Sequence, residues 1–74
     1  MKIVNIKPAK DYKIHIVLDD GREGFFDVSP YLEYEAFKEL KNPDSFNKII
    51  NGSYYVEWDC GADLSIDTIE AHLN

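Results

Sequence analysis

The stretch of sequence that decides the fold is DYKIHIVLDDGREGFFDV, residues 11–28. Successive side chains of a strand point to opposite faces of a sheet, and the first half of this stretch follows that period of two. One face would carry Tyr12, Ile14, Ile16 and Leu18, and the other would carry Lys13, His15, Val17 and Asp19. Asp19-Asp20-Gly21 then brings turn-forming residues together, so the stretch predicts a β-hairpin.

Two turn geometries compete for this hairpin. A two-residue loop would place Ile16 opposite Phe25, whereas a three-residue loop, residues 19–21, would place Ile14 opposite Phe26. A shift of one residue moves every side chain to the other face of the sheet. We prefer the three-residue loop because it collects apolar side chains on one face. Its glycine would then take the left-handed conformation of a bulged turn.

Outside the hairpin, the sequence predicts a strand before it and helical structure after it. In the preceding strand Val4 and Ile6 would share one face, and Pro8 would end the strand or keep it at the edge of the sheet. Ser29 and Pro30 suit the N-cap and the first position of a helix. The apolar stripe of that helix would be Leu32, Ala36, Phe37 and Leu40.

The helical stretch can be continuous or broken. It is expected to stop at Asn42-Pro43, and a break near Tyr34 would divide it into a turn and a separate helix. Residues 44–50 fit either a helical turn or an edge strand, because three apolar residues in this short run satisfy both periods. Asn51-Gly52 is a turn signal that separates this run from the next strand.

The C-terminal part of the chain predicts one strand and one helix. The strand at residues 53–58 would have two sides, Tyr54, Val56 and Trp58 against Tyr55 and Glu57. The helix would bury one face formed by Ile66, Ile69 and Leu73. Asp67 followed by Glu70 resembles a capping box at the start of this helix.

Together these elements predict one α+β domain over residues 1–74, with an antiparallel sheet of about four to five strands covered by one or two helices. The sequence shows no internal repeat. A core this small provides thin stability, so a partner surface or a homodimer is expected.

The charge of the chain restricts its partners. Its net charge is −6, with 8 basic residues spread along the chain against 14 acidic ones. Nucleic-acid binding and attachment to anionic membranes both depend on clustered Lys and Arg, so neither is expected. A basic protein is the partner that this charge favours.

The expected compartment is the cytoplasm. Cys60 is the single cysteine and has no internal partner for a disulfide, which fits a reducing environment. No apolar run approaches the roughly 18 residues that a membrane span needs, and the N-terminus lacks the apolar core of a signal peptide.

The segment WDCGADLS, residues 58–65, gathers the residues that could carry chemistry. A catalytic thiol at Cys60 would need a nearby cation, but its neighbours Asp59 and Asp63 push the thiol pKa in the wrong direction. The acidic residues lack the spacing of a calcium loop, and one cysteine with two scattered histidines does not supply a zinc site. No enzyme, no metal ligand and no cofactor is therefore expected here.

The simplest interpretation of this segment is a turn between two elements. Gly61 would allow a positive φ, and Asp59 and Asp63 could accept main-chain hydrogen bonds. The remaining possibility is a contact site for a partner protein, with Trp58, Asp59, Asp63 and Tyr55 as its candidate residues. The alternative function is a small-molecule or metal-ion binding domain around Trp58–Asp63.

The order of these landmarks resembles the bacterial domain of unknown function family 2442 over essentially the whole chain. The family marks are a "dy-x-L-x-v-x-F-x-dG" opening, a "f-x-x-L-x-d-x-x-x-F" middle and a "W-p-n-G-x-D-l-x-p-d" close. The matching residues of the middle and close are Phe37, Leu40, Phe46, Trp58, Gly61, Asp63, Leu64 and Asp67. The chain departs from these marks at Asp59 and Cys60, where Pro and Asn are common, and at Ser65-Ile66.

This resemblance implies a small α+β domain without an established activity. Members stand alone, precede a helix-turn-helix segment, or are encoded beside another small protein in an arrangement like a toxin–antitoxin pair. No helix-turn-helix pattern is expected before the chain ends at Asn74. The leading hypothesis is a cytoplasmic protein-interaction module that forms the acidic member of a two-protein regulatory pair.

Overall fold

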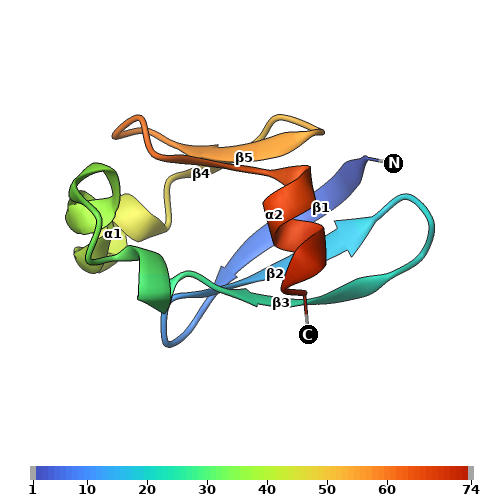
Figure 1. Cartoon of the computed structure of the whole chain (residues 1–74), viewed down its shortest axis with the longest axis horizontal. Coiled ribbons are helices and arrows are strands. Elements are labelled where there is room, and N and C mark those ends of the chain that lie inside the picture. Colours follow the sequence, from blue (N-terminus) through green and yellow to red (C-terminus); the bar gives the residue numbers. More distant parts are fainter. Residues whose placement is uncertain (1, 74) are drawn as a thin grey trace.

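The computed structural model describes residues 2–73, which form two antiparallel sheets that face each other (Figure 1). Sheet A contains β1 (Ile3–Ala9), β2 (Lys13–Leu18) and β3 (Glu23–Asp27). Sheet B contains β4 (Ile49–Asn51), β5 (Tyr55–Trp58) and β6 (Asp63–Ser65). The helical elements are the 3₁₀ helices η1 (Ser29–Tyr31) and η2 (Glu35–Lys41) and the α-helices α1 (Pro43–Phe46) and α2 (Ile66–Ala71).

The mixture of strands and helices confirms the predicted α+β class, but the prediction of a single sheet of four to five strands is wrong. Each sheet is a meander in which neighbouring strands follow one another in sequence. The helical stretch 29–46 lies between the two meanders along the chain and occupies one end of the molecule, beside both sheets (Figure 1). The apolar faces of the sheets are therefore buried against each other rather than joined edge to edge.

The hairpin of β2 and β3 has the predicted three-residue loop. Ile14 lies opposite Phe26, and the Leu18 N–H donates to the carbonyl of Arg22 at 2.8 Å, which closes the loop. Gly21 has a φ of +93°, as the bulged turn requires. The alternation in residues 11–28 thus determined the register correctly.

The register of β1 differs from the prediction because the strand contains a β-bulge. Ile3 pairs with Leu18 while Asn5 pairs with Val17, so β1 has one extra residue between them. The bulge places Ile3 in the core and leaves Val4 55% exposed, so the expectation that Val4 and Ile6 share one face is wrong. Pro8 remains within the strand, which it can do because β1 is an edge strand.

The helical stretch after β3 is broken, as one of the two expectations allowed. Ser29 does not act as the predicted N-cap; instead Asp27 Oδ1 accepts hydrogen bonds from the Ser29 hydroxyl at 2.7 Å and the Ser29 N–H at 3.0 Å. In η2 the buried residues are Phe37 and Leu40, and Ala36 is exposed. A 3₁₀ helix has three residues per turn, so its buried stripe follows i and i+3 and excludes the i+4 neighbour that an α-helix would include.

The two α-helices begin at caps that the sequence signals only partly. Asn42 ends η2 and also caps α1, because its side-chain oxygen accepts the Asp44 N–H at 3.0 Å. Residues 44–50 contain both alternatives, with α1 first and β4 after it. The predicted capping box of Asp67 and Glu70 is wrong, since α2 is capped by Ser65, which accepts the Thr68 N–H at 3.3 Å.

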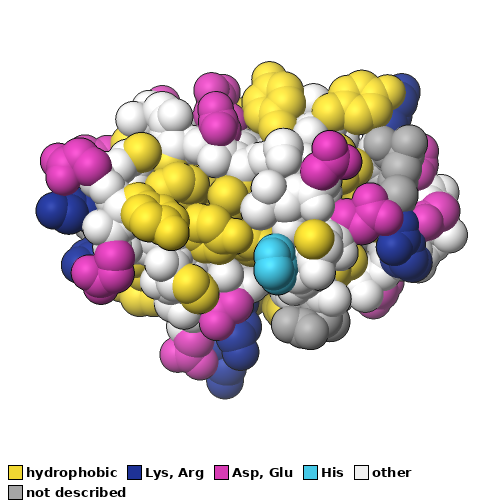
Figure 2. Space-filling view, viewed as in Figure 1, with side chains coloured by type: hydrophobic (Ala, Val, Ile, Leu, Met, Phe, Trp, Pro, Cys, Tyr) yellow, Lys and Arg dark blue, Asp and Glu magenta, His cyan; other side chains and the backbone are white. Residues whose placement is uncertain are grey.

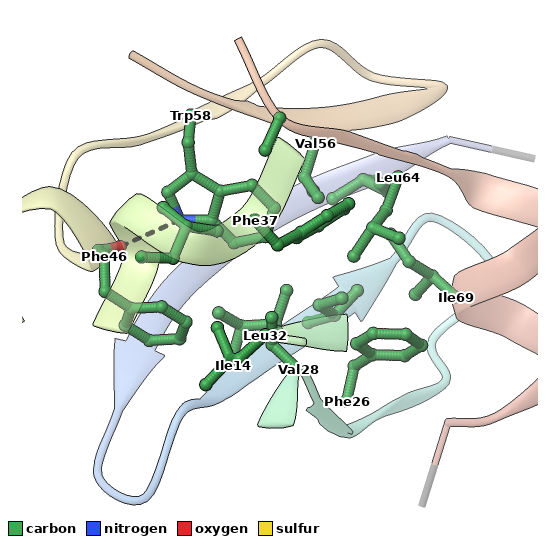
Figure 3. Packing of buried hydrophobic residues seen from close by; sticks show 14 of the residues in the cluster. Ile14, Phe26, Val28, Leu32, Phe37, Phe46, Val56, Trp58, Leu64 and Ile69 are labelled. Carbon is green, nitrogen blue, oxygen red and sulfur yellow. Dashed lines mark hydrogen bonds between the residues drawn. The ribbon is translucent and has the colours of Figure 1, made fainter. Parts of the chain in front are cut away.

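The core lies between the two sheets and is closed at one end by η2 and α1. Figure 3 shows Val56, Trp58 and Leu64 extending from sheet B toward Ile14 and Phe26 of sheet A. Phe37 lies between them, and Ile69 of α2 closes another side. Among residues 2–73, no polar or charged residue is buried, so the interior contributes packing and offers no ionisable group for chemistry.

Candidate functional site

The turn from β5 to β6 has the same geometry as the loop between β2 and β3. The Trp58 N–H donates to the Ala62 carbonyl at 2.9 Å, and the Gly61 N–H donates to the Trp58 carbonyl at 2.9 Å. Gly61 has a φ of +97°, close to that of Gly21. The two loops share an Asp-x-Gly spacing, which is a sequence signal that prediction of the second turn could have used.

Trp58 lies in the core and is only 1% exposed. Its indole N–H donates to the Phe46 carbonyl at 2.9 Å (Figure 3), and its ring contacts those of Phe37 and Phe46. The surface of the turn is therefore formed by Asp59, Cys60 and Asp63, which are exposed.

The two aspartates of the turn do not cap its main chain. Within residues 2–73, the side chains of Asp59 and Asp63 form no hydrogen bond and no ion pair, contrary to the expectation that they accept main-chain N–H groups. The first loop is different, because Asp20 accepts from the Arg22 N–H at 3.0 Å. Cys60 occupies the place that corresponds to Asp20, so this acceptor is absent in the second loop.

The turn does not gather the groups that a metal would need. Among residues 2–73, no group of three or more His, Cys, Asp or Glu side chains is placed to hold a metal ion. Two hollows of the surface lie away from the turn, one against Tyr31 and Tyr34 and the other against Phe25. No helix within residues 2–73 is long and apolar enough to cross a membrane.

The face of sheet B that points away from the core carries exposed apolar side chains, and another stands in the turn beside it. Ile50 is 50% exposed, Tyr55 is 43% exposed, and Tyr54, in the turn before β5, is 54% exposed. Figure 2 shows hydrophobic side chains standing beside acidic ones along the border of the molecule that sheet B forms. We refer to Ile50, Tyr55, Glu57 and Asp63 as the sheet B face.

The register of sheet B brings two carboxylates together on this face. Glu57 lies directly opposite Asp63, and Ile50 lies opposite Glu57 on the other side. The bonded pairs of this hairpin include Trp58 with Ala62, so Glu57 and Asp63 form a non-hydrogen-bonded pair, in which side chains approach most closely. Like charges in such a pair repel, and neither carboxylate has a cationic partner within residues 2–73.

Tyr55 is held on this face by its glycine neighbour. A Cβ atom at Gly52 would clash with Cζ of the Tyr55 ring, so the ring lies directly over Gly52. The expectation that Tyr55 and Glu57 point away from the core is confirmed. Tyr54 was expected with the core residues, but it lies in the turn before β5, where the two-residue period no longer applies. Ile50 was missed because residues 44–50 could not be assigned to one element.

The chain matches the family described as "Protein of unknown function (DUF2442)" over residues 3–74. It therefore belongs to this family, and the resemblance seen in the sequence is confirmed. No curated protein and no solved structure matches the chain. Membership assigns no activity, so any function must be argued from the surface itself.

Proposed function

We propose that this chain is a protein-interaction module, the acidic member of a two-protein regulatory pair, and that it binds a basic partner through the sheet B face. The observation that carries the proposal is the pair of Glu57 and Asp63, which lie directly opposite each other with no cation from residues 2–73 between them. A Lys or Arg side chain of a partner placed between the two carboxylates would relieve their repulsion and form charge-assisted hydrogen bonds.

The apolar neighbours of this pair provide the rest of an interface. Exposed Tyr side chains are typical of interface centres because they bury a large area at a small cost in conformational entropy. Tyr55 is already fixed over Gly52, so little freedom is lost when a partner covers it. The side chain of Ile50, in the same row as Glu57, would become buried in the complex.

The charge of the whole chain supports a basic partner rather than a second copy. A net charge of −6 attracts a cationic protein at long range and raises the association rate. Two copies that met through the sheet B face would bring their acidic pairs toward each other. The homodimer expected from the small size of the chain remains a prediction that would require another surface.

The test begins with capture of stoichiometric partners from native lysate and continues with the purified partner in calorimetry. Glu57→Gln combined with Asp63→Asn should weaken binding, and so should Tyr55→Ala. The matched control is Glu33→Gln with Glu39→Gln, which removes the same charge from another part of the surface. Added salt should weaken the wild-type complex more than the Glu57/Asp63 variant. Equal affinity of the sheet B face variant and the control, or absence of any stoichiometric partner, would refute the proposal.

A further inference from the structure

The two outer edges of sheet A differ in how they are covered. The edge of β1 is joined to sheet B, because the Ile3 N–H donates to the Ser53 carbonyl at 2.7 Å and the Asn51 side-chain amide donates to the Ile3 carbonyl at 3.0 Å. The strand β3 pairs only with β2 in the described structure, and its other edge has no neighbouring strand (Figure 1). This edge of β3 is therefore open to another strand.

The open edge presents unpaired main-chain groups. The carbonyl of Arg22 accepts from Leu18, and the N–H of Val28 donates to the Tyr12 carbonyl, so even-numbered residues of β3 bond to β2. By alternation, the N–H and C=O groups of Glu23, Phe25 and Asp27 point away from β2. Within residues 2–73, no hydrogen bond reaches these groups from the open side. Such a row of donors and acceptors is the template for strand addition.

Hollows lie on both faces of the sheet beside this edge. The inner hollow has a volume of about 510 Å³ and is lined by Phe26, Asp27, Tyr31, Tyr34 and the end of α2. Figure 2 shows hydrophobic side chains gathered between the helical end of the molecule and α2, with a histidine at their border. The outer hollow has a volume of about 540 Å³ and is lined by Phe25, Asp27, Lys13 and the β1–β2 turn. Since side chains of a strand alternate between faces, a strand added to β3 would send them into both hollows.

The chemistry of the two hollows differs. In the inner hollow, the exposed ring of Tyr34 lies 6.1 Å from the ring of Tyr31. Such aromatic faces suit a guanidinium or ammonium group. The outer hollow contains Lys10 and Lys13 as well as acidic groups, so its charge is balanced, and Phe25 offers an apolar surface. The outer hollow therefore suits an aliphatic side chain.

The charges on the edge also argue against self-association. An antiparallel pairing of two β3 strands centred on Phe25 would place Glu23 of one copy opposite Asp27 of the other. Like charges directly opposite are destabilising. The net charge of −6 favours instead a strand that carries basic residues.

We propose that β3 accepts an extended basic segment of a partner protein as an additional strand of sheet A, with an arginine or lysine side chain in the inner hollow and an aliphatic one in the outer hollow. This site goes beyond the proposed function, because it uses a different surface and its ligand can be tested without the partner. The strand pairing supplies affinity through main-chain hydrogen bonds, and the hollows supply the preference for alternating basic and aliphatic residues.

The test uses synthetic peptides and ¹⁵N-labelled full-length chain in NMR. A short peptide that alternates arginine and valine should shift the amide signals of Glu23, Phe25 and Asp27 in a saturable way and slow their hydrogen exchange. A peptide that alternates glutamate and valine should not bind. Binding of the arginine peptide should weaken as salt is added. Saturable shifts confined to residues outside β3 and its hollows, or no saturable shift at all, would overturn the proposal.

Variants distinguish strand addition from general charge attraction. Phe25→Pro removes a donor that faces solvent and keeps the bonds to β2, and it should weaken peptide binding by about tenfold. Tyr34→Ala and Glu23→Lys are surface changes that leave the ladder intact, and each should weaken binding several-fold. Tyr55→Ala, which alters only the sheet B face, should bind the peptide like the wild type. Unchanged affinity in Tyr34→Ala and Glu23→Lys would refute the site, whatever the behaviour of Tyr55→Ala with the native partner.

Discussion

The indole N–H of Trp58 donates to the carbonyl of Phe46 at 2.9 Å, and this bond ties sheet B to the end of α1. A second aromatic residue makes the equivalent connection from the turn between β1 and β2, because the hydroxyl of Tyr12 donates to the Lys41 carbonyl. The rings of Tyr12 and Trp58 also both pack against Phe46, with ring centroids 5.4 Å and 6.0 Å away. One aromatic residue beside each sheet therefore fixes the helical end of the molecule.

Substitution of Trp58 by Phe should destabilise the fold. The change removes a buried donor from the Phe46 carbonyl and leaves a cavity, with an expected loss of about 2–3 kcal/mol in the free energy of unfolding. Urea denaturation followed by far-UV circular dichroism measures this loss without relying on tryptophan fluorescence. Tyr54→Phe, in an exposed ring, is the control and should change stability little. A Trp58→Phe variant as stable as that control would show that the bond does not hold the two elements together.

Substitutions at the glycines should distinguish the cost of backbone strain from the effect of steric contact. Gly21 and Gly61 have positive φ angles and open space where a Cβ would lie, so Ala at either position costs about 1 kcal/mol through strain alone. Asn tolerates this conformation better, so Gly61→Asn should cost less than Gly61→Ala in urea denaturation. Gly52→Ala should instead displace the Tyr55 ring, with altered ring signals in NMR. Equal costs for Ala and Asn at Gly61 would contradict the strain argument.

The sequence was sufficient for the elements whose signal is local and regular. The alternation in β2 and the glycine of its loop determined the register, because a one-residue slip would have exposed Ile14 and Phe26. The β-bulge in β1 was beyond this reasoning, since a single extra residue reverses the face assignment and leaves no mark in composition. The division into two sheets was also missed, because strand pairing between distant segments depends on the whole core.

The residues of the candidate site were also predicted only in part. Tyr55, Asp59 and Asp63 are exposed, but Trp58 is in the core, where its large apolar area outweighs its single polar group. The opposition of Glu57 and Asp63 could not be read from the chain, because it depends on the loop that joins β5 to β6. Recognition that residues 58–62 repeat the Asp-x-Gly loop of residues 18–22 would have provided that register.

Asp27 should make the stability of the fold sensitive to acid. The Ser29 hydroxyl and then the Ser29 N–H donate to its carboxylate and hold the pKa of Asp27 below the ordinary value of 3.8. Because the folded pKa is the lower one, the stabilisation is present above the unfolded pKa and is lost as pH falls through the folded pKa. The change therefore lies at pH values below the ordinary range of carboxyl groups.

Ser29→Ala tests this assignment. The variant removes the hydroxyl donor and keeps the main-chain donor, so the pKa of Asp27 should rise toward its ordinary value in an NMR titration of the carboxyl carbons. Asp20, whose pKa is lowered mainly by the main-chain N–H of Arg22, is an internal reference that should not move. The loss of stability between neutral and acidic pH should be smaller in Ser29→Ala than in the wild type. A titration of Asp27 that is unchanged by the substitution would show that the hydroxyl has no role.

The N-terminus of α2 should depend on Ser65 and not on the acidic residues that follow it. Ser65 accepts the Thr68 N–H, so Ser65→Ala should cost about 1 kcal/mol in urea denaturation. Asp67→Asn should cost less, because Asp67 interacts only with the weak dipole of a short helix. A larger loss in Asp67→Asn than in Ser65→Ala would restore the capping-box interpretation that the structure contradicts.

Cys60→Asn should stabilise the turn between β5 and β6. In the first loop, Asp20 accepts the Arg22 N–H at 3.0 Å, and Cys60 occupies the corresponding place in the second loop without a comparable acceptor. An Asn side chain there could accept the Ala62 N–H and add about 0.5–1 kcal/mol to the free energy of unfolding. Asn is also the residue that the family resemblance favours at this position. Cys60→Ala is the matched control, since it removes the thiol without supplying an acceptor. Urea denaturation that shows the same stability for Asn and Ala would mean that this loop gains nothing from a side-chain acceptor.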